Sequence, residues 1–500
     1  MFKKVLIANR GEIAVRIIRA CREMGIRPVA VFSDVDRTAL HVRLAEEALP
    51  LGGSHPSETY LNIDKIIALA RSSGAEAIHP GYGFLAENAR FVERCEKEGI
   101  VFVGPPSRPM ELMGQKTTSR QVMSKAGVPI IPGTLEPVQS EKDLRDSAER
   151  IGYPLLLKAS GGGGGKGLRL VRQAGELESN FRLARSEADS SFGDPSIYVE
   201  KYIEDPHHIE VQILADHHGR TVYLGERECS LQRRYQKVLE ETPSPFLDEK
   251  TRRFMGRTAV KAAASIGYRN AGTVEFIVDS RRNFYFLEMN ARLQVEHPIT
   301  EMVTGIDLVK KQFEIAAGMP LGLEQKDIRP QGHALECRIY AEDPDNDFLP
   351  SPGRIIHLHT PAGGLGIRED SGIYEGYNVP FEYDPLLAKL IAWGKTREEA
   401  VQRMRRALSE YRIYGIKTTV PFFQRILSHP QFLAGLYSTH FIGNLEKGPA
   451  KENNEEKLAA VLAAGLKSYF AIHKTDSPPT AAKTGGWKLQ GRLQNLADRL

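Results

Sequence analysis

The chain has 500 residues, of which 41% are hydrophobic and 26% charged, the balance of an ordinary globular protein with roughly three domains. A net charge of +4 argues against a nucleic-acid surface, and apolar runs such as residues 458–466 are too short to span a membrane. There is no signal-peptide core at the start, and the four scattered cysteines lack metal-ligand spacing, so we expect a cytoplasmic protein with reduced thiols.

The N-terminal region alternates strands and helices. Val5 to Ala8 predicts a short buried strand, a helix with an apolar stripe from Ile13 to Met24 follows, and Val29 to Phe32 predicts the next strand. A strand, a helix and a second strand in this order are typical of a parallel sheet. The alternation ends near Gly104, where we expect a first boundary.

Six glycines occupy seven positions from Gly161 to Gly167, after a strand that ends at Lys158. Because each glycine costs backbone entropy, the run indicates a backbone that approaches a polyphosphate closely; a flexible linker is the alternative. The spacing is not that of a P-loop, since Ser160 and Gly167 stand where that motif needs glycine and Ser or Thr. Lys158 and Lys166 favour a mobile flap over phosphates.

Two polar patterns follow. Residues 208–214 alternate, with His208, Glu210 and Gln212 on one face of a predicted strand and apolar residues on the other. The cationic segment 232–237 follows a strand pattern that ends at Gly225. A solvated loop is the ordinary interpretation of such a segment, but cations there would also neutralise phosphoryl oxygens or hold a small anion.

Residues 273–279 and 284–290 alternate polar and apolar positions around a short connection, which predicts a β-hairpin. Symmetric closure predicts four cross-strand pairs: Asp279–Phe284, Ile277–Phe286, Glu275–Glu288 and Thr273–Asn290. Like charges directly opposite repel, but a hard cation between Glu275 and Glu288 reverses that effect. Three polar residues continue the spacing: Arg292, Gln294 and Glu296. The hairpin therefore predicts a metal-dependent site, with a solvated strand pair as the alternative.

Together these motifs resemble those of biotin carboxylase, an ATP-grasp enzyme, over roughly residues 1–447. The segments that carry the resemblance are Ile7–Ala14, Ile78–Leu85, Lys158–Gly167, His208–Glu210, Gln232–Lys237, Glu288–His297, Tyr374–Tyr377 and Tyr383–Pro385. The resemblance implies a multidomain α/β and α+β fold. Its expected parts are a Rossmann-like pre-ATP-grasp domain (1–115), a linker (116–135), an ATP-grasp lid (136–203) and central domain (204–331), a biotin carboxylase C-terminal domain (332–447) and a tail (448–500).

The resemblance also implies roles for individual residues. ATP would be bound by Lys116, Lys158, Gly163, Gly164, Gly165, Glu200, Lys201, Tyr202, Ile203, His208, Gln232, Tyr235, Glu275 and Glu288. Magnesium or manganese would be held by Glu275, Glu288 and Asn290. Bicarbonate would lie against Lys237, Arg292, Gln294 and the backbone of Val295, with Glu296 as its base. Biotin would lie near Tyr82, and its enolate would be stabilised by Arg338; the implied catalytic residues are Arg292, Glu296, Arg338 and Lys237.

The implied reaction is ATP- and bicarbonate-dependent carboxylation of biotin through carboxyphosphate. Because the chain has no Met-Lys-Met biotinylation sequence, biotin would arrive on a separate biotin carboxyl carrier protein. Carboxyltransferase subunits would be further partners, and a homodimer is the expected assembly. Residues 487–492 resemble the stretch before the carrier region of longer acyl-CoA carboxylase α subunits, which favours an acetyl-CoA or acyl-CoA carboxylase of fatty acid biosynthesis over the biotin carboxylase subunit of a pyruvate carboxylase.

Three positions depart from the family pattern. Tyr235 stands where histidine is common, Lys166 replaces a frequent arginine, and Ala86 replaces a common serine. A phenol still donates a hydrogen bond, whereas lysine loses the bidentate geometry of arginine. Two other functions stay open: another ATP-grasp ligase that joins an acyl phosphate to an amine, and a nucleotide-sensing scaffold without turnover.

Overall fold

The computed structural model describes residues 1–159, 167–361, 363–445, 462–463 and 465–466. Contacts divide the chain into two units, Met1–Leu445 and Glu446–Leu500. No helix within the described residues is long and apolar enough to cross a membrane.

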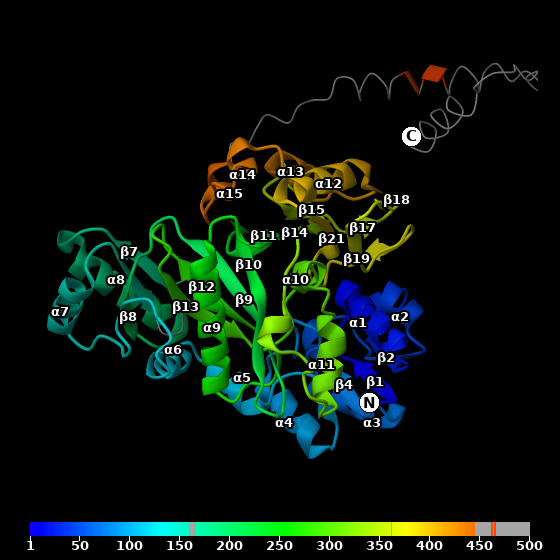
Figure 1. The fold of residues 1–500 in the computed structure, drawn as a ribbon, viewed down its shortest axis with the longest axis horizontal. Helices are drawn as coiled ribbons and strands as arrows, with labels where there is room; N and C mark the ends of the chain where they lie inside the picture. The colour runs from blue at the N-terminus through cyan, green and yellow to red at the C-terminus, as the bar shows by residue number, and fades with distance from the viewer. Residues whose placement is uncertain (160–166, 362, 446–461, 464, 467–500) are drawn as a thin grey trace, which may run out of the picture. The chain divides into compact units, whose positions relative to one another are not determined.

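The N-terminal part is a parallel α/β layer, as predicted (Figure 1). Its sheet has the order β3-β2-β1-β4-β5, with β1 (Lys4–Ile7), β2 (Arg27–Phe32), β3 (Glu47–Pro50), β4 (Ala77–His79) and β5 (Val101–Phe102). Its helices are α1 (Gly11–Glu23), α2 (Leu40–Leu44), α3 (Ile63–Ser73), α4 (Ala89–Lys97) and α5 (Ser107–Gly114), and α6 (Lys116–Lys125) follows α5 in the chain. The stripe of α1 is buried because Ile13, Ile17 and Cys21 share one helix face.

A smaller antiparallel sheet, β7-β6-β8, follows in the chain. It contains β6 (Leu155–Ala159), β7 (Leu168–Val171) and β8 (Ile197–Lys201), and α7 (Glu141–Ile151) and α8 (Leu177–Phe192) pack on it. Leu155 and Leu157 face its separate apolar core. The predicted phosphate flap lies largely in residues 160–166, outside the described part of the chain.

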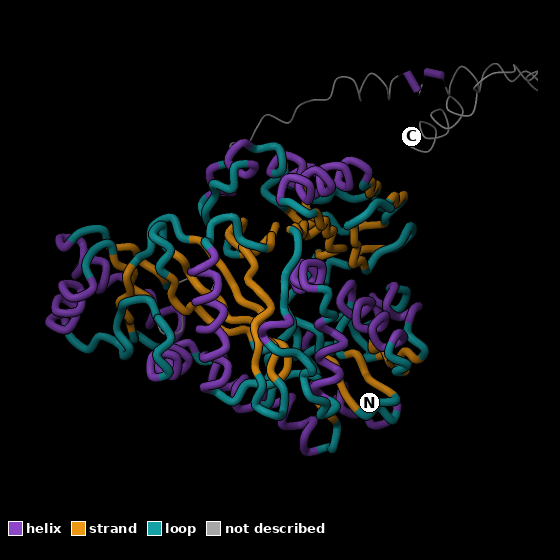
Figure 2. Tube along the Cα trace, viewed as in Figure 1, coloured by secondary structure: helices purple, strands orange, loops and turns teal. Residues whose placement is uncertain are grey.

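The largest layer is an antiparallel sheet of the order β13-β12-β9-β10-β11-β14-β21-β19 (Figure 2). Its strands are β9 (His207–Ala215), β10 (Thr221–Arg233), β11 (Gln236–Thr242), β12 (Asn270–Val278), β13 (Phe284–Asn290), β14 (His333–Tyr340), β19 (Ile367–Ser371) and β21 (Leu386–Gly394). The sheet crosses the expected boundary between residues 331 and 332 without a break in its hydrogen bonds, through the pair β11–β14. The division into lid, central and C-terminal domains stays a prediction.

Helices and short strands complete this part of the chain. The helices are α9 (Glu249–Ser265), α10 (His297–Thr304), α11 (Leu308–Ala316), α12 (Arg397–Glu410), α13 (Val420–Ile426), α14 (Pro430–Leu433) and α15 (Phe441–Asn444). The short strands are β15 (Glu342–Asp343), β16 (Leu349–Pro350), β17 (Gly353–Arg354), β18 (His357–His359), β20 (Asn378–Val379) and β22 (Arg412–Tyr414).

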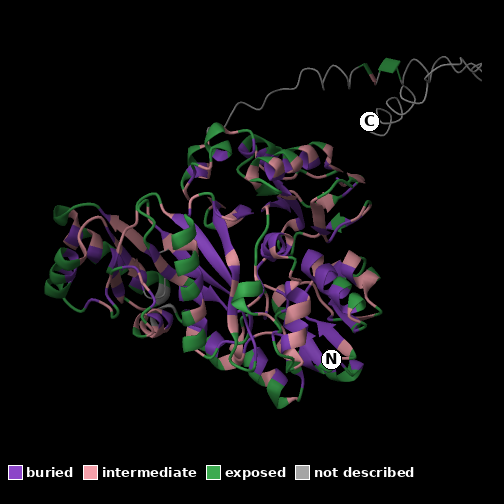
Figure 3. Ribbon diagram, in the orientation of Figure 1, coloured by how far each residue is buried: buried purple, intermediate pink, exposed green. Residues whose placement is uncertain are grey.

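The two faces of the large sheet differ in chemistry, although both are covered. Strand β9 is buried along its whole length (Figure 3). Ile209, Val211 and Ile213 join an apolar core with residues of α9, which confirms the predicted alternation of this strand. The other face carries His208, Glu210 and their polar neighbours. A buried row of charged groups requires internal partners, and these form the site described below.

The β12–β13 hairpin brings the predicted acidic pair together, but through a different register. The observed pairs are Thr273–Asn290, Val274–Met289, Glu275–Glu288, Phe276–Phe286, Ile277–Tyr285 and Val278–Phe284. The predicted pairs Ile277–Phe286 and Asp279–Phe284 are therefore wrong. Asp279 belongs to the loop, where its carboxylate accepts the backbone N–H groups of Arg281 and Asn283. A bulge at Leu287 then returns the register to Glu275–Glu288.

Strand β10 is longer than predicted. Gly225 does not end it, but forms an irregular step with φ +98° between Tyr223 and Glu226. The strand continues to Arg233, and a two-residue turn joins it to β11. Arg234 and Tyr235 in that turn both have positive φ, at +50° and +67°, as a type I′ hairpin turn requires. The cationic segment is thus a hairpin end rather than an irregular loop.

We expect the Phe276→Ala substitution to lower the free energy of unfolding by about 3–5 kcal/mol, because it leaves a cavity behind the acidic hairpin. Phe276 is 0% exposed and its ring contacts Phe284 at a centroid distance of 5.3 Å. Phe254→Ala is the matched control, since Phe254 contacts the same Phe284 but is 51% exposed. Chemical denaturation of both variants measures the difference; equal losses would contradict this account of the core.

Candidate functional site

Lys237 lies at the centre of the polar face of the large sheet. Its ammonium contacts Glu210 Oε2 at 2.5 Å, Glu275 Oε1 at 2.8 Å and Glu296 Oε1 at 2.9 Å. The three carboxylates come from β9, from β12 and from the segment before α10. Lys237 reaches them because the pairs Leu231–Leu239 and Gln232–Lys237 leave Val238 as an extra residue in β11. Lys237 and Leu239 consequently face opposite sides of the sheet.

Glu275 is the acceptor at which four of the predicted residues meet: Lys237, His208, Asn290 and Gln294. Its Oε2 lies 2.7 Å from His208 Nε2, and its Oε1 accepts from Asn290 at 2.8 Å and from Gln294 at 3.0 Å. Gln232 in turn contacts His208 Nδ1 at 2.5 Å. Glu288 lies directly opposite Glu275 in the ladder, which places both side chains on one face; Glu275 is buried and Glu288 exposed.

Arg292 lies beside the acidic pair and is held by its neighbours. It donates to Asn290 Oδ1 at 2.9 Å and to Gln294 Oε1 at 2.5 Å. Its Nε donates to Glu87 Oε2 at 2.9 Å, which ties the segment to the N-terminal part of the chain. The guanidinium is therefore oriented by three side chains.

Glu296 is clamped between two cations. Lys237 contacts one of its oxygens, and Arg338 Nη2 contacts the other, Oε2, at 2.9 Å. The same Nη2 lies 2.5 Å from Glu240 Oε1. Arg338 comes from β14 and Glu240 from β11, two strands that pair directly. Successive ion pairs from Lys237 through Glu296 and Arg338 to Glu240 thus link the expected bicarbonate residues to the expected biotin residue.

The buried charges shift each other's protonation. Burial alone would lower the pKa of Lys237, but the charges of Glu210, Glu275 and Glu296 outweigh it and hold that pKa well above the usual value. Burial would raise the pKa of Glu296, but Lys237 and Arg338 hold it well below the usual value. Burial raises the pKa of Glu240 to about 7. Glu296 is consequently an ionised carboxylate, and a weak base as long as both cations contact it.

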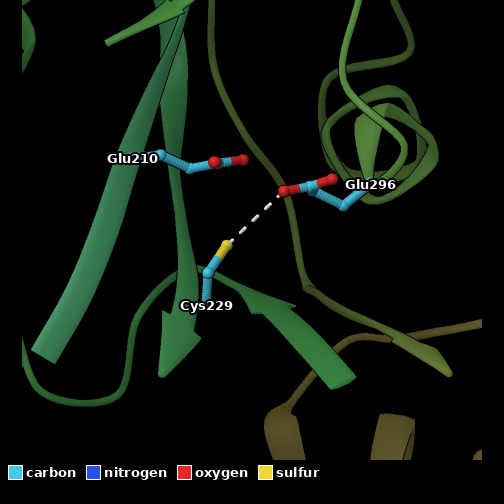
Figure 4. Close-up of side chains that lie close together, drawn as sticks. All are labelled: Glu210, Cys229 and Glu296. Atoms are coloured by element: carbon cyan, nitrogen blue, oxygen red, sulfur yellow. Dashed lines mark hydrogen bonds between the residues drawn. The ribbon is translucent and has the colours of Figure 1, made fainter. Parts of the chain in front are cut away.

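A second arrangement near Lys237 involves Cys229. Figure 4 shows its thiol directed at Glu296, with Glu210 opposite, and the Sγ atom lies 3.8 Å from Glu296 Oε1. One ligand atom from each of these three residues lies within 4.8 Å of the others, close enough for a metal ion. The Lys237 ammonium already contacts both carboxylates, so it takes the cation's place in this arrangement.

The predicted nucleotide residues form a second group on the small sheet. Glu200 is buried and contacts Lys158 at 2.5 Å, and it also pairs with Arg120. Lys201 donates to the carbonyl oxygens of residues 152 and 153, at 3.1 Å and 2.6 Å. The Tyr202 backbone N–H donates to the Pro154 carbonyl oxygen at 3.0 Å, and Ile203 follows Tyr202 in the chain. This group positions the end of β8.

Among the remaining predicted residues, those with described side chains lie outside the contacts of Lys237 and of Glu200. Tyr235 is 71% exposed at the β10–β11 turn. The Tyr82 hydroxyl donates to Glu12, and the Val295 carbonyl accepts from Lys389 at 2.9 Å. Lys116 begins α6, and Gly163, Gly164 and Gly165 lie outside the described residues.

Four site residues were not predicted: Glu87, Glu210, Arg227 and Glu240. Arg227 is fully buried and pairs with Glu210 at 2.5 Å. It therefore offsets one of the negative charges that the single ammonium of Lys237 leaves uncompensated among Glu210, Glu275 and Glu296. Glu210 carried a usable signal, because it stands between His208 and Gln212 on the polar face of β9. Glu87 and Glu240 carried none, since their partners Arg292 and Arg338 lie far away in the chain.

Three family models match consecutive parts of the chain. The biotin carboxylase N-terminal domain matches residues 1–110, and the biotin carboxylase C-terminal domain matches residues 336–444. Between them, the ATP-binding domain of the carbamoyl-phosphate synthase L chain matches residues 115–324.

Curated relatives share about half of their residues with the chain. It is 53% identical to biotin carboxylase 1 of Bacillus subtilis, over 88% of the chain and 98% of that protein. It is 54% identical to a pyruvate carboxylase subunit of Methanothermobacter thermautotrophicus, over 90% of the chain and 91% of that protein. It is 47% identical to the propionyl-CoA carboxylase alpha chain of Ruegeria pomeroyi, over 100% of the chain and 75% of that protein.

Solved structures give the same result. The biotin carboxylase domain of 2-oxoglutarate carboxylase from Hydrogenobacter thermophilus, a dimer in complex with MgADP and bicarbonate, has a TM-score of 0.82 at 50% identity, over 89% of the chain and 97% of its own. A complex of biotin carboxylase from Campylobacter jejuni has a TM-score of 0.83 at 47% identity, over 89% of the chain and 99% of its own. The chain therefore belongs to the biotin carboxylase family of ATP-dependent ligases.

Proposed function

We propose that the chain carboxylates biotin on a separate carrier protein, using ATP and bicarbonate, as the first half-reaction of an acetyl-CoA or acyl-CoA carboxylase. The contacts of Lys237 are the observation that carries this proposal, because its ammonium touches the ionised Glu296 and is linked through Glu275 and Gln294 to the oriented guanidinium of Arg292. A solved relative holds MgADP and bicarbonate together, in a dimer. A homodimer, a biotin carboxyl carrier protein and carboxyltransferase subunits are the proposed partners.

The acidic hairpin suits a divalent cation. Glu275 and Glu288 offer hard carboxylate oxygens from directly opposed positions, and Asn290 adds an amide side chain on the same face. Mg²⁺ or Mn²⁺ bound there would offset phosphoryl charge. The nucleotide would extend from this hairpin to Lys116, Lys158, the glycines 163–165 and the segment 200–203, with His208, Gln232 and Tyr235 beside it.

Bicarbonate would lie between Lys237 and Arg292, with Gln294 and the Val295 backbone beside it. Glu296 would take its proton, and the resulting dianion would attack the γ-phosphorus to give carboxyphosphate and ADP. Bicarbonate that takes a hydrogen bond from Lys237 withdraws it from Glu296. Loss of this contact would raise the basicity of Glu296, so substrate binding itself would prepare the base.

Carboxyphosphate would then break down to CO2 and phosphate. Phosphate or a nearby base would take the N1′ proton of biotin, and N1′ would attack CO2. Arg338 would stabilise the enolate form of the ureido group, because its guanidinium is fixed by Glu240 and Glu296. Tyr82 would border the biotin.

The alignment with acyl-CoA carboxylase chains supports this holoenzyme. The propionyl-CoA carboxylase relative aligns over 100% of the chain, whereas the pyruvate carboxylase relative aligns over 90%. We expect carboxyl transfer to an acyl-CoA when the chain is combined with a biotinylated carrier and carboxyltransferase subunits. Acetyl-CoA, propionyl-CoA and pyruvate are compared as acceptors; transfer to pyruvate alone would contradict the proposed holoenzyme but leave biotin carboxylation intact.

We expect Glu288→Gln to reduce bicarbonate-dependent ATP hydrolysis by at least about 100-fold, because one metal-binding charge is removed while the shape is kept. Phosphate release at saturating magnesium measures the loss. Asp279→Asn is the matched control, since it removes one charge from the loop of the same hairpin. Similar activity in the two variants would contradict the metal assignment.

We expect Arg338→Ala to reduce carboxylation of free biotin by about 100-fold or more while bicarbonate-dependent ATP hydrolysis falls by less than about tenfold. The reason is that Lys237 still contacts Glu296 after Arg338 is removed. The ratio of the two activities in one preparation is the measurement and its own control. Equal loss of both would show that Arg338 acts before biotin enters.

A further inference from the structure

Lys389 is a buried cation with no role in the mechanism above. It lies on β21 and is 0% exposed. Lysine is almost never fully buried unless it is paired, because its ammonium loses its hydration. In the ladder Lys389 lies directly opposite Arg338, so the two cations share one face of the sheet. Lys389 therefore requires buried partners that offset its charge.

The Lys389 ammonium joins segments that are far apart in the chain. It donates to the Val295 carbonyl at 2.9 Å and pairs with Glu12 Oε1 at 3.2 Å. Asp370 Oδ2 is 4.0 Å away, and the centroid of the Tyr82 ring is 5.7 Å away. The contacts come from α1, from the loop after β4, from the segment before α10 and from β19.

Glu12 extends this arrangement to Tyr82. The Tyr82 hydroxyl donates to Oε1 of Glu12, the same oxygen that pairs with Lys389. One ammonium–carboxylate pair thus holds a backbone carbonyl of the expected bicarbonate segment and a hydroxyl of the expected biotin residue. Tyr82 is fixed at both its ring and its hydroxyl.

The backbone around Glu12 is closely packed against Gly372. A Cβ added to Gly372 would lie 2.7 Å from the Glu12 backbone nitrogen and 2.8 Å from the Gly11 carbonyl carbon. Only glycine fits where two backbones approach this closely. The start of α1 therefore contacts the backbone of Gly372, the residue that follows β19. The position of Glu12 is consequently set by backbone packing rather than by its own side chain alone.

Fixing the Val295 carbonyl also fixes its neighbours. A peptide unit is planar, so the hydrogen bond from Lys389 sets the orientation of the peptide between Val295 and Glu296. Gln294 precedes this peptide, and its carbonyl accepts from His297 Nδ1 at 2.8 Å. The segment that carries Gln294 and Glu296 is therefore held from both sides.

We propose that Lys389, acting with Glu12, is a positioning residue for both substrates of the carboxylation: it sets the bicarbonate segment through the Val295 carbonyl and the biotin-side hydroxyl of Tyr82 through Glu12. This inference rests on the proposed function, because Val295 and Tyr82 matter here only as contacts of bicarbonate and biotin. Lys389 touches neither substrate.

The test is the Lys389→Met variant, with steady-state kinetics against bicarbonate, ATP and free biotin. We expect the KM for bicarbonate and the KM for biotin each to rise about five- to tenfold, as one hydrogen bond is lost to each segment, while the KM for ATP changes less than twofold. Tyr82→Phe removes only the hydroxyl. It should raise the KM for biotin and leave the KM for bicarbonate within twofold of wild type.

Arg397→Met is the control, because Arg397 pairs at 2.7 Å with Glu241, which is as buried as Glu12, and contacts none of the proposed substrate residues. It should lower thermal stability and leave all three KM values unchanged. If Lys389→Met does not fold, Lys389→Met combined with Glu12→Gln removes both charges of the pair and is measured in its place.

Unchanged KM values in Lys389→Met would overturn the inference, whatever the loss of stability, since they would assign Lys389 a purely structural role. An unchanged KM for biotin in Tyr82→Phe would overturn the Glu12 half of it. Wild-type protein without bicarbonate-dependent ATP hydrolysis would instead overturn the proposed function, and the inference with it. The two failures are thus distinguished in one set of assays.

Discussion

The site depends on the pairing of one buried ammonium with three carboxylates. Lys237 is surrounded by Glu210, Glu275 and Glu296, each within hydrogen-bond distance. None of these charges is stable alone in the interior, because burial costs several kcal/mol per ion before the partners offset it. Three carboxylates around one ammonium leave an excess of negative charge. Arg227 offsets part of it by pairing with Glu210, and Arg338 does so by pairing with Glu296. Removing any one of these cations leaves a buried carboxylate that must take up a proton or water.

This charge row is possible because the large sheet separates its two faces. On β9 the apolar residues enter the core with α9, and the polar residues face the site. Strand β11 needs an extra residue, Val238, to place Lys237 on the polar face while Leu239 remains in the apolar core. Because the sheet continues through β14 to β21, the same face carries Arg338 and Lys389. Residues expected to bind different substrates therefore share one rigid support.

The sequence predicts the chemistry of this site better than it predicts the geometry of the site. The pairing of Glu275 with Glu288 is correct, but two deviations cancel: Asp279 closes a longer loop, and the bulge at Leu287 restores the register. Alternation alone contains no information about a bulge. The parallel N-terminal sheet was predictable because βαβ units leave periodic local patterns. Contacts such as Glu87 with Arg292 and Glu12 with Lys389 are set by tertiary packing and leave no local signal.

The pairing around Lys237 also explains how a site of this kind can exist before substrate binds. Its cations already have carboxylate partners, so an incoming anion must exchange places with them rather than enter an open positive pocket. For Glu296 that exchange would remove the hydrogen bond from Lys237, and a carboxylate that loses such a donor becomes more basic. Divalent cations at Glu275 and Glu288 would arrive with the triphosphate, which keeps the local charge nearly balanced. With the proposed roles, proton removal from bicarbonate would be coupled to its binding, and Glu296 would be a weak base until the substrate is present.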